Sequence, residues 1–534
     1  MPPVDFRFAT DSKPNPCQLS DSKDTVSMPI FGGLILQTPS VTQLTDALLR
    51  HNYFPAMGKR QDELPPSVNS RGLTRRVANE ILSACTVDRG VRRDFDAVNY
   101  ESTRFNLVTR RLSIPHPLPY VRLVNCIATN WKDLKYLTKN KASQFRPTVH
   151  GDGRIFAMNY GEQSYQNRIY NRWLRFGSEY RVSADVANFY PSFYTHSMPW
   201  AIAGHQTAKS NRSPTIWYNK LDHAFSDCNR GETHGLHVGP GTSALAAEIV
   251  LHAIDNSLGG KYKYIRFIDD YKFYAGDRRE AEQFILELAE QLAAFGLMLN
   301  NNKTTIEMLP LPGNPDWMRT LIPQVPKSTQ FSQLEPYLEE ATELAKRTPE
   351  GNVLKFAVAA VRDAKEIDTR ADEILPCLFA ISFHNPELLP DVSLIFETSN
   401  ADGASYTDEL NTLLQRHARF GRSDGMSWIL HIMRKEGVKI CDESVDSVIR
   451  TKDCIPILLL HKLGQSSSTT AVKTYAQNEL KANTYEYDID KYWLLYYELF
   501  REGVISNPYP NLKRQSSARM SFEILKKNGI SFTQ

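Results

Sequence analysis

Hydrophobic and polar residues follow different patterns along the chain. Residues 1–28 are polar, include Pro14 and Pro16 and predict a flexible segment. Helical spacing follows in LTRRVANEILSAC and VRLVNCIATNWKDLKYL. Between about 145 and 310, strand-like runs (RVSADV, YKYIRFI, YKFYAG) alternate with helical runs (SALAAEIVLHAID, EAEQFILELAEQLAAFG). This mixture predicts an α+β domain with a small antiparallel sheet.

The pattern changes after two proline-rich stretches, LPLPGNPDW and IPQVPKS. Beyond them almost every apolar run has helical spacing, as in NVLKFAVAAVRDA, ELNTLLQRHARF and SWILHIMRKEG. Helices with short connections predict an α-solenoid or an irregular bundle. We therefore expect a flexible segment 1–28, an α+β part 29–325 and a helical part 326–534. The stretch GQSSSTT at 464–470 is expected to be a surface loop.

Composition narrows the class of protein only slightly. The 534 residues are 41% hydrophobic and 23% charged, with a net charge of +3, which neither indicates nor excludes a nucleic-acid partner. The seven cysteines are odd in number and show no CxxC spacing, which favours reduced thiols in a cytosolic protein. The polar N-terminus does not resemble a signal peptide, and we expect no membrane span and a cytoplasmic location.

The first candidate for chemistry is an aspartate at the end of a strand-like run. Asp185 follows RVSA and precedes a polar and aromatic turn, VANFYPS. A carboxylate at a strand end can hold a hard cation, because Mg²⁺ prefers oxygen ligands and is commonly bound by one or two carboxylates plus substrate phosphates. The competing interpretation is that Asp185 merely starts a turn.

The second candidate is a pair of adjacent acids, Asp269 and Asp270, between two apolar strand-like runs. Two like charges this close disfavour the ionisation of both groups. A bound divalent cation would remove that conflict. The competing interpretation is an exposed acidic turn, which the aromatic flanks make less favourable.

The third candidate is the glycine-rich loop GLHVGPG at 235–241, which precedes a helical run. Glycines such as Gly239 allow a backbone to approach a base or a sugar closely. Thr242 or Ser243 is a plausible N-cap of the helix. Taken alone, the segment is better explained as a plain loop before a capped helix.

Together these segments resemble palm motifs A, B and C of reverse transcriptases. Motif C of that family is an aromatic residue, any residue and Asp-Asp, here Phe267-Ile268-Asp269-Asp270, and FGLMLN at 295–300 followed by Lys303-Thr304 resembles motif D. The resemblance implies a DNA polymerase with two Mg²⁺ ions about 4 Å apart, for which Mn²⁺ could substitute. Their ligands would be Asp185, Val186, Asp269 and Asp270. His237 replaces the usual proline of motif B, which places templated copying in doubt.

The resemblance also implies a binding site for the incoming nucleotide. Tyr190 lies five residues after Asp185, where the family has a large aromatic residue beneath the sugar. Such a ring would clash with a 2′-hydroxyl and select dNTPs, although Tyr190 could equally be a core aromatic. We assign Phe189 and Gly239 to the same substrate site.

Three basic residues are expected to act on the phosphates. Lys303 follows the motif D pattern and could protonate the leaving pyrophosphate or neutralise its charge. Arg146 and Arg154 precede motif A, where residues of the fingers grip the triphosphate. Arginine suits bidentate phosphate contacts. The competing interpretation for Lys303 is an ordinary exposed lysine.

One group within the family is more similar than the rest. NFYPSFYTHS at 188–197 with Trp200-Ala201, and IPHP at 114–117, resemble signatures of bacterial abortive-infection and defence-associated reverse transcriptases. This resemblance implies a HEAT-like helical domain, assembly into homo-oligomers and antiphage activity. It further implies DNA synthesis without a template from a hydroxyl of the protein, so that the DNA product stays covalently attached.

Two alternatives remain open from the sequence. The chain could be a conventional RNA-templated reverse transcriptase with a dedicated noncoding RNA. It could also be a scaffold or sensor whose palm only binds nucleotides or RNA. The intact carboxylates argue against the second alternative, because a palm without activity has no reason to keep a repulsive Asp-Asp pair.

Overall fold

The fold is described from a computed structural model. It describes residues 37–533 except 57, 59–61, 105–107, 159–173, 327–330, 365–370, 400 and 483–484. The predicted flexible segment 1–28 therefore lies outside the described residues. Residues 37–534 form one compact unit, so the division that we predict near residue 325 stays a prediction.

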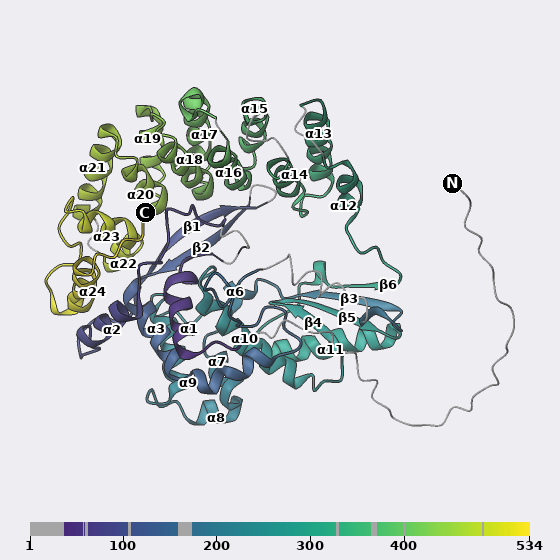
Figure 1. Ribbon diagram of the computed structural model, residues 1–534. Helices are drawn as coiled ribbons and strands as arrows, with labels where there is room; N and C mark the ends of the chain where they lie inside the picture. The colour runs from purple at the N-terminus through teal and green to yellow at the C-terminus, as the bar shows by residue number, and fades with distance from the viewer. Residues whose placement is uncertain are drawn as a thin grey trace, which may run out of the picture. The chain divides into compact units, whose positions relative to one another are not determined.

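The α+β part contains a four-stranded antiparallel sheet, as the alternation of strand-like and helical runs predicts (Figure 1). The strand order is β4-β5-β3-β6. The strands are β3 (Tyr180–Asp185), β4 (Tyr264–Phe267), β5 (Asp270–Ala275) and β6 (Thr305–Met308). The long helices α10 (Gly241–Ser257) and α11 (Arg278–Ala293) pack beside this sheet, as their apolar spacing requires.

A second, two-stranded antiparallel sheet is formed by β1 (Ala97–Thr103) and β2 (Thr109–Pro115). Shorter helices surround both sheets. They are α1 (Val41–Asp46), the π-helix η1 (Ala47–His51), α2 (Arg75–Ala84), α3 (Pro117–Thr129), α4 (Trp131–Leu134), η3 (Lys135–Lys139), α6 (Phe189–Ser192), α7 (Ser197–Ala203), α8 (His205–Ser210), α9 (Trp217–Asp227) and η4 (Asn301–Lys303).

The described residues beyond 315 form helices and turns, apart from an isolated bridge between Thr533 and Val68. The longer helices are α12 (Asp316–Leu321), α13 (Phe331–Arg347), α14 (Val353–Arg362), α15 (Ala371–Ser382), α16 (Leu389–Thr398), α17 (Thr407–Arg419), α18 (Ser423–Lys435), α19 (Asp442–Arg450), α20 (Cys454–Lys462), α21 (Ser466–Ala482), α22 (Glu486–Asp490), α23 (Trp493–Arg501) and α24 (Ser516–Lys527). Short 3₁₀ turns are η5 (Ile322–Gln324), η7 (Pro386–Leu388), η8 (Gly403–Tyr406) and η9 (Lys513–Gln515).

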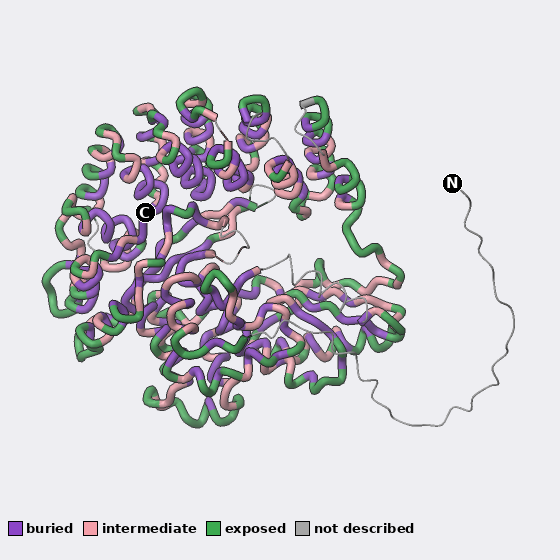
Figure 2. The backbone as a smooth tube through the Cα atoms, in the orientation of Figure 1, coloured by how far each residue is buried: buried purple, intermediate pink, exposed green. Residues whose placement is uncertain are grey.

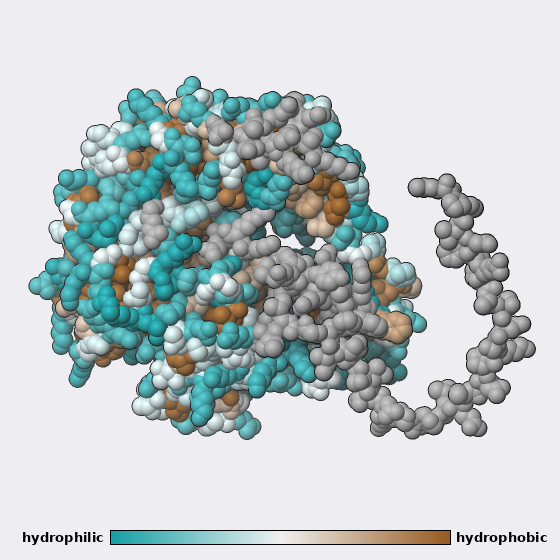
Figure 3. Space-filling view, in the orientation of Figure 1, coloured by the Kyte–Doolittle hydropathy of each residue, from teal (hydrophilic) through white to brown (hydrophobic). Residues whose placement is uncertain are grey.

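Successive helices of this half pack side by side, and their inner faces are buried while their outer turns are exposed (Figure 2). Hydrophilic residues predominate on the face drawn in Figure 3, and hydrophobic ones form small patches there. The apolar spacing of the sequence therefore predicts the helices correctly, and their HEAT-like character stays a prediction.

The loop predicted at 464–470 is wrong from Ser466 onward, because α21 begins at that residue. Ser and Thr are tolerated in a first helical turn, where their hydroxyls can bond to nearby carbonyls. Here the Thr469 hydroxyl donates to the carbonyls of Gln465 and Ser466, and Ser468 donates to Gln465. Among the described residues, no helix is long and apolar enough to cross a membrane.

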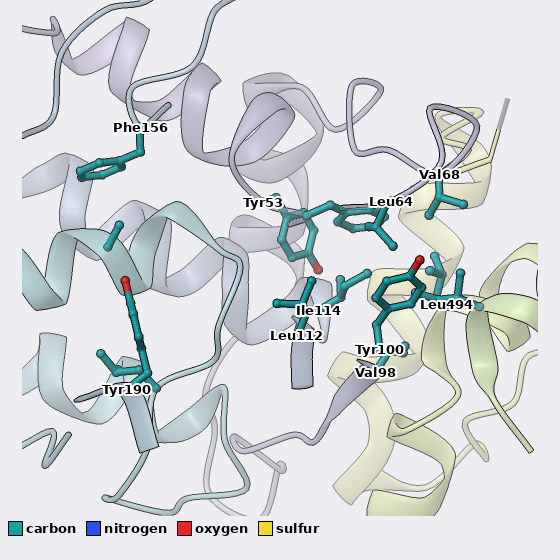
Figure 4. Packing of buried hydrophobic residues seen from close by; sticks show 14 of the residues in the cluster. Tyr53, Leu64, Val68, Val98, Tyr100, Leu112, Ile114, Phe156, Tyr190 and Leu494 are labelled. Atoms are coloured by element: carbon teal, nitrogen blue, oxygen red, sulfur yellow. The ribbon is translucent and has the colours of Figure 1, made fainter. Parts of the chain in front are cut away.

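The helical half packs on the β1–β2 hairpin through apolar and polar contacts. Val98, Tyr100 and Ile114 of the hairpin lie beside Leu494 of α23 in one buried cluster (Figure 4). The indole nitrogen of Trp493 donates to the carbonyl of Ile114 at 3.0 Å. The hairpin is therefore held between the two halves of the sequence.

Polar groups at the start of α18 complete this contact along the outer edge of β1. The backbone N–H of Glu101 donates to the Ser423 hydroxyl at 2.8 Å, and that of Thr103 donates to the Asp424 carboxylate at 2.7 Å. Free N–H groups at the edge of a sheet can pair with another chain. The start of α18 satisfies two of them on β1.

Candidate active site

The three candidate aspartates meet where β3 ends beside the β4–β5 hairpin. In the antiparallel register of β3 and β5, Asp185 lies directly opposite Asp270. The backbone N–H of Val186 donates to the carbonyl of Asp269 at 3.3 Å. The structure thus brings Asp185 and the Asp269–Asp270 pair together, although Asp185 and Asp269 lie 84 positions apart in the sequence.

The charges of these aspartates influence one another. Burial raises the pKa of the Asp269 carboxyl to about 6, the nearby Asp185 adds to this rise, and Arg110 and Lys303 oppose it. Burial and then the charge of Asp269 raise the pKa of Asp270 to about 6 as well. Asp270 is exposed to solvent, which screens such effects, so Asp269 carries the stronger argument.

Residues of the motif D segment hold Asp185 from the other side. The side-chain amide of Asn300 donates to Oδ2 of Asp185 at 3.1 Å, and its backbone N–H donates to the Asp185 carbonyl at 2.7 Å. The Lys303 ammonium lies 3.6 Å from Oδ1 of Asp185 and is half exposed. Lys303 is therefore close enough to offset part of the negative charge of the carboxylates.

The donor set fits a divalent cation, although the described residues contain no group of three His, Cys, Asp or Glu side chains already arranged as a metal site. Carboxylate oxygens are ligands that Mg²⁺ prefers. Burial is the main cause of the raised pKa of Asp269, the negative charge of Asp185 adds to it, and a bound cation would relieve that repulsion. The two-ion site with Asp185, Val186, Asp269 and Asp270 as ligands stays a prediction.

A short turn leads from β3 to the predicted sugar-binding residues. Asn188 adopts a left-handed conformation with φ 45°, which asparagine tolerates better than most residues, and α6 follows with Phe189 and Tyr190. Both rings are largely buried, and they contact each other edge to face. Burial and then the charge of Asp269 raise the pKa of the Tyr190 hydroxyl, so the phenol stays neutral near the carboxylates.

Tyr190 lines a cavity of about 990 Å³ between the α+β part and the start of the helical part. Gly239, Ile268 and Arg110 line the same cavity, and Lys346, Lys355 and His384 contribute from the helical side. Asp185, Asp270 and Lys303 line a second cavity of about 500 Å³. Tyr190 therefore lines one cavity and the predicted metal ligands Asp185 and Asp270 line the other, whereas Val186 and Asp269 line neither of the two.

The glycine loop takes a conformation that its sequence requires. Gly239 has φ +124°, and a Cβ there would lie 2.6 Å from the Pro55 side chain. A larger residue is excluded both by the backbone conformation and by Pro55. His237 is anchored away from the large cavity, where its Nε2 donates to the carbonyl of Cys228 at 2.8 Å.

Two of the predicted phosphate-binding residues already contact protein groups. Arg146 donates to the carbonyl of Asn140 at 3.0 Å. Arg154 is buried, is paired with Asp152, and donates to the carbonyls of Ala56 and Gly58 at 2.6 Å each. Arg154 thus anchors the loop that follows η1, and neither arginine lines the two cavities. Their role in triphosphate binding stays a prediction.

Sequence reasoning missed Arg104 and Arg110, which lie at the turn end of the β1–β2 hairpin and line the large cavity. Arg104 directly follows β1, and its backbone N–H donates to the carbonyl of Val108 at 2.9 Å. Burial and the charge of Arg110 lower the pKa of Arg104, while Asp269 opposes this shift. In the sequence, apolar and polar residues alternate in AVNYEST and TRRLSIP. This pattern predicts a hairpin with arginines at its turn.

Residues 115–341 match the family model described as reverse transcriptase (RNA-dependent DNA polymerase). This range includes the four-stranded sheet and all three candidate aspartates. The chain therefore contains a reverse transcriptase domain. That domain indicates a nucleotidyltransferase of the RNA-directed DNA polymerase type.

Comparisons with curated proteins and with solved structures do not narrow the function further. No curated protein matches the chain. Among solved structures, apo telomerase from Candida tropicalis has 12% sequence identity and a TM-score of 0.31, covering 79% of this chain and 74% of that one. Telomerase from Candida albicans with a fragment of telomeric RNA has 10% identity and a TM-score of 0.28, covering 75% and 67%. At these TM-scores the likeness carries no argument about fold or function.

Proposed function

We propose that the chain is a DNA polymerase of reverse-transcriptase type that adds dNTPs at the site formed by Asp185, Asp269 and Asp270. The observation that carries the proposal is the register that sets Asp185 opposite the Asp-Asp hairpin within a reverse transcriptase domain. Two bound Mg²⁺ ions, or Mn²⁺ in their place, would supply the positive charge that activates the attacking hydroxyl and stabilises the leaving pyrophosphate.

Side chains of the protein would hold the cations, orient one of their ligands and bind the phosphates. Asp185 and Asp269 would hold the cations, and Asn300 would keep the Asp185 carboxylate in one orientation through its 3.1 Å hydrogen bond. Arg104 and Arg110 would bind phosphate oxygens from the β1–β2 hairpin, since arginine donates to phosphates in a bidentate manner. Lys303 would stand near the departing pyrophosphate.

Tyr190 would select dNTPs over rNTPs, so that the product is DNA. Its ring is held on one side by Phe189 and faces the large cavity on the other. A fixed ring beneath the sugar excludes a 2′-hydroxyl by steric clash, which penalises rNTPs without improving the binding of dNTPs. This role is consistent with a neutral phenol that contributes shape and no charge.

Two sequence segments support a more specific role in the cell. The NFYPSFYTHS and IPHP segments support membership of the bacterial abortive-infection and defence-associated group. We therefore propose a cytoplasmic antiphage enzyme that forms homo-oligomers, starts DNA on a hydroxyl of its own and remains covalently attached to the product. His237 in place of the usual proline supports synthesis without a template.

RNA-templated synthesis with a dedicated noncoding RNA is the second candidate function. The description of the matching family model, an RNA-dependent DNA polymerase, favours it. Both candidates use the same aspartates and the same dNTPs. They differ in what supplies the primer and whether RNA is needed.

One experiment separates the candidates. The purified chain is incubated with a single labelled dNTP and Mg²⁺, with and without RNA, and is analysed by denaturing electrophoresis before and after nuclease treatment. Nuclease-sensitive label on the protein without RNA supports protein-primed synthesis. Label that appears only with RNA supports the templated enzyme.

The matched control is Asp269→Asn, which removes a charge and keeps the shape of the side chain. It should incorporate no label under either condition. Absence of label from the wild-type chain under every condition, including Mn²⁺, would favour a scaffold or sensor and overturn the proposal.

A further inference from the structure

The turn that carries Asp269 has a strained backbone. Ile268, the residue before Asp269, has φ 55°, in the left-handed region. A β-branched residue with positive φ is a genuine outlier, and such a conformation is unfavourable unless its surroundings impose it. Something in the structure must therefore hold this turn.

Arg266, two residues before Ile268, is in a position to do so. Its side chain is completely buried, and its Nη1 donates to the Ile268 carbonyl at 3.3 Å. The same guanidinium donates to Glu248 at 2.7 and 3.1 Å. Because the guanidinium is planar and its donors are fixed, these hydrogen bonds connect α10 to the turn in one defined geometry.

The opposite edge of the guanidinium is fixed as well. Its Nε donates to Asp255 at 2.9 Å, and Asp255 also accepts from Asn140 and Tyr264 at 2.7 Å each. Glu248 and Asp255 lie seven residues apart on α10, which places them on one face of the helix. The backbone of Arg266 is bonded on both sides to the neighbouring segment, at Ala142 and Gln144.

We propose that Arg266, held by Glu248 and Asp255, is a positioning residue that keeps the strained Ile268 turn in the conformation that presents Asp269 to Asp185. This inference rests on the proposed function, because it assigns a task to a group that touches no substrate. A buried ion pair is by itself weak evidence for stability, since its desolvation cost can exceed its attraction. The link to Ile268 gives this pair a role beyond stability.

The test replaces the pair by apolar groups of similar size, Arg266→Met with Glu248→Leu, in an Asp255→Asn background, so that no buried charge is left without its partner. Such replacements of a buried ion pair are often neutral for stability, whereas removal of one partner leaves an unpaired charge. The matched control is Asp255→Asn, which weakens the same network but keeps the donation to Ile268. Arg266→Lys is the second variant if the pair replacement does not fold, since lysine keeps a charge near Glu248 without the planar fork.

Amide hydrogen exchange of peptides spanning 264–275 is measured for each full-length variant, together with thermal unfolding and dNTP incorporation. We expect exchange in this hairpin to rise and incorporation to fall by about tenfold or more in the pair variant, as loss of a charged hydrogen bond predicts. Asp255→Asn should change both by less than about threefold, even where it lowers the unfolding temperature as much.

Ile268→Gly supplies a further readout. Glycine adopts positive φ at little cost, so the turn then needs less support. The loss caused by the pair replacement should be at least about threefold smaller in the Ile268→Gly background. Equal losses in both backgrounds, or unchanged hairpin exchange in the pair variant, would overturn the inference. Should the wild type incorporate no nucleotide, the proposed function fails, while the exchange comparison still decides the role of Arg266.

Discussion

Asn300 donates two hydrogen bonds to Asp185, one from its side chain at 3.1 Å and one from its backbone at 2.7 Å. The two residues come from segments that the sequence separates by more than a hundred positions. The side-chain bond fixes one carboxylate oxygen and leaves Oδ1 facing Lys303. Asn300 therefore controls the orientation of a predicted metal ligand.

Asn300→Ala should lower the rate of dNTP incorporation by about tenfold or more, because a hydrogen bond to a charged group contributes about 1.5–3 kcal/mol. Single-turnover incorporation at saturating dNTP measures the effect. Asn302→Ala, two residues along and exposed, is the control and should be nearly neutral. Equal rates in the two variants would show that the orientation of Asp185 does not depend on Asn300.

Asp269→Asn should change stability in a pH-dependent way. Because burial raises the pKa of Asp269 to about 6, the folded state binds a proton more tightly than the unfolded state. The stabilisation by the protonated form is complete below the unfolded pKa of about 4 and is lost as the pH rises through about 6. The asparagine resembles the protonated carboxyl at every pH.

In metal-free buffer, Asp269→Asn should therefore unfold at a higher temperature than the wild type at pH 8, and the difference should shrink toward pH 5. Magnesium should reverse the order at pH 8 by stabilising only the wild type. Thermal scans at the two pH values with EDTA or Mg²⁺ measure this. A wild type that is the more stable form in EDTA at pH 8 would contradict the repulsion described for this carboxylate.

Tyr190→Ala should raise the use of rNTPs relative to dNTPs by at least about tenfold, or roughly 1.4 kcal/mol. The ring blocks a 2′-hydroxyl by its volume, so Tyr190→Phe should leave the preference nearly unchanged. Competition between labelled dGTP and GTP measures the ratio. An Ala variant that is active with unchanged preference would make Tyr190 a packing residue only.

A fragment ending at residue 325 should be inactive and should associate with itself. It would lose Ser423 and Asp424, which accept hydrogen bonds from the outer edge of β1. It would also expose the apolar face of the hairpin that packs on Leu494 (Figure 4). Unpaired strand edges favour association between chains. Light scattering and incorporation assays test this, and a monomeric, fully active fragment would contradict it.

Local patterns in the sequence predict the elements that local spacing determines. The strands β3, β4 and β5 and the helices α10 and α11 lie where alternation and helical periodicity place them. Asp185 ends β3 and Asp270 begins β5, so the two residues meet in one small sheet. The order of the motifs in the sequence indicates this arrangement. These features depend on residues close together in the chain.

Contacts between distant segments could not be predicted in this way. The sequence alone suggests that Arg154 is available to bind phosphate. In the structure it donates to the carbonyls of Ala56 and Gly58, almost a hundred residues earlier in the chain. Arg266 reads as a charged residue in an apolar strand, and only the packing of α10 shows that two carboxylates bury it. Nothing in the local pattern of Thr103 indicates that Asp424 accepts its N–H.

The packing of the β1–β2 hairpin also dictates an order of events during synthesis. His116, just after β2, stacks between Phe95 and Phe522, and Thr533 bridges to Val68. Contacts of such sequence separation form late, because a long loop must close before they can contribute. A ribosome that has made all four motifs has not yet made the residues that pack on the hairpin. The nascent chain therefore carries its aspartates before the packing around the hairpin is complete, and its apolar segments stay exposed until the last helices have been made.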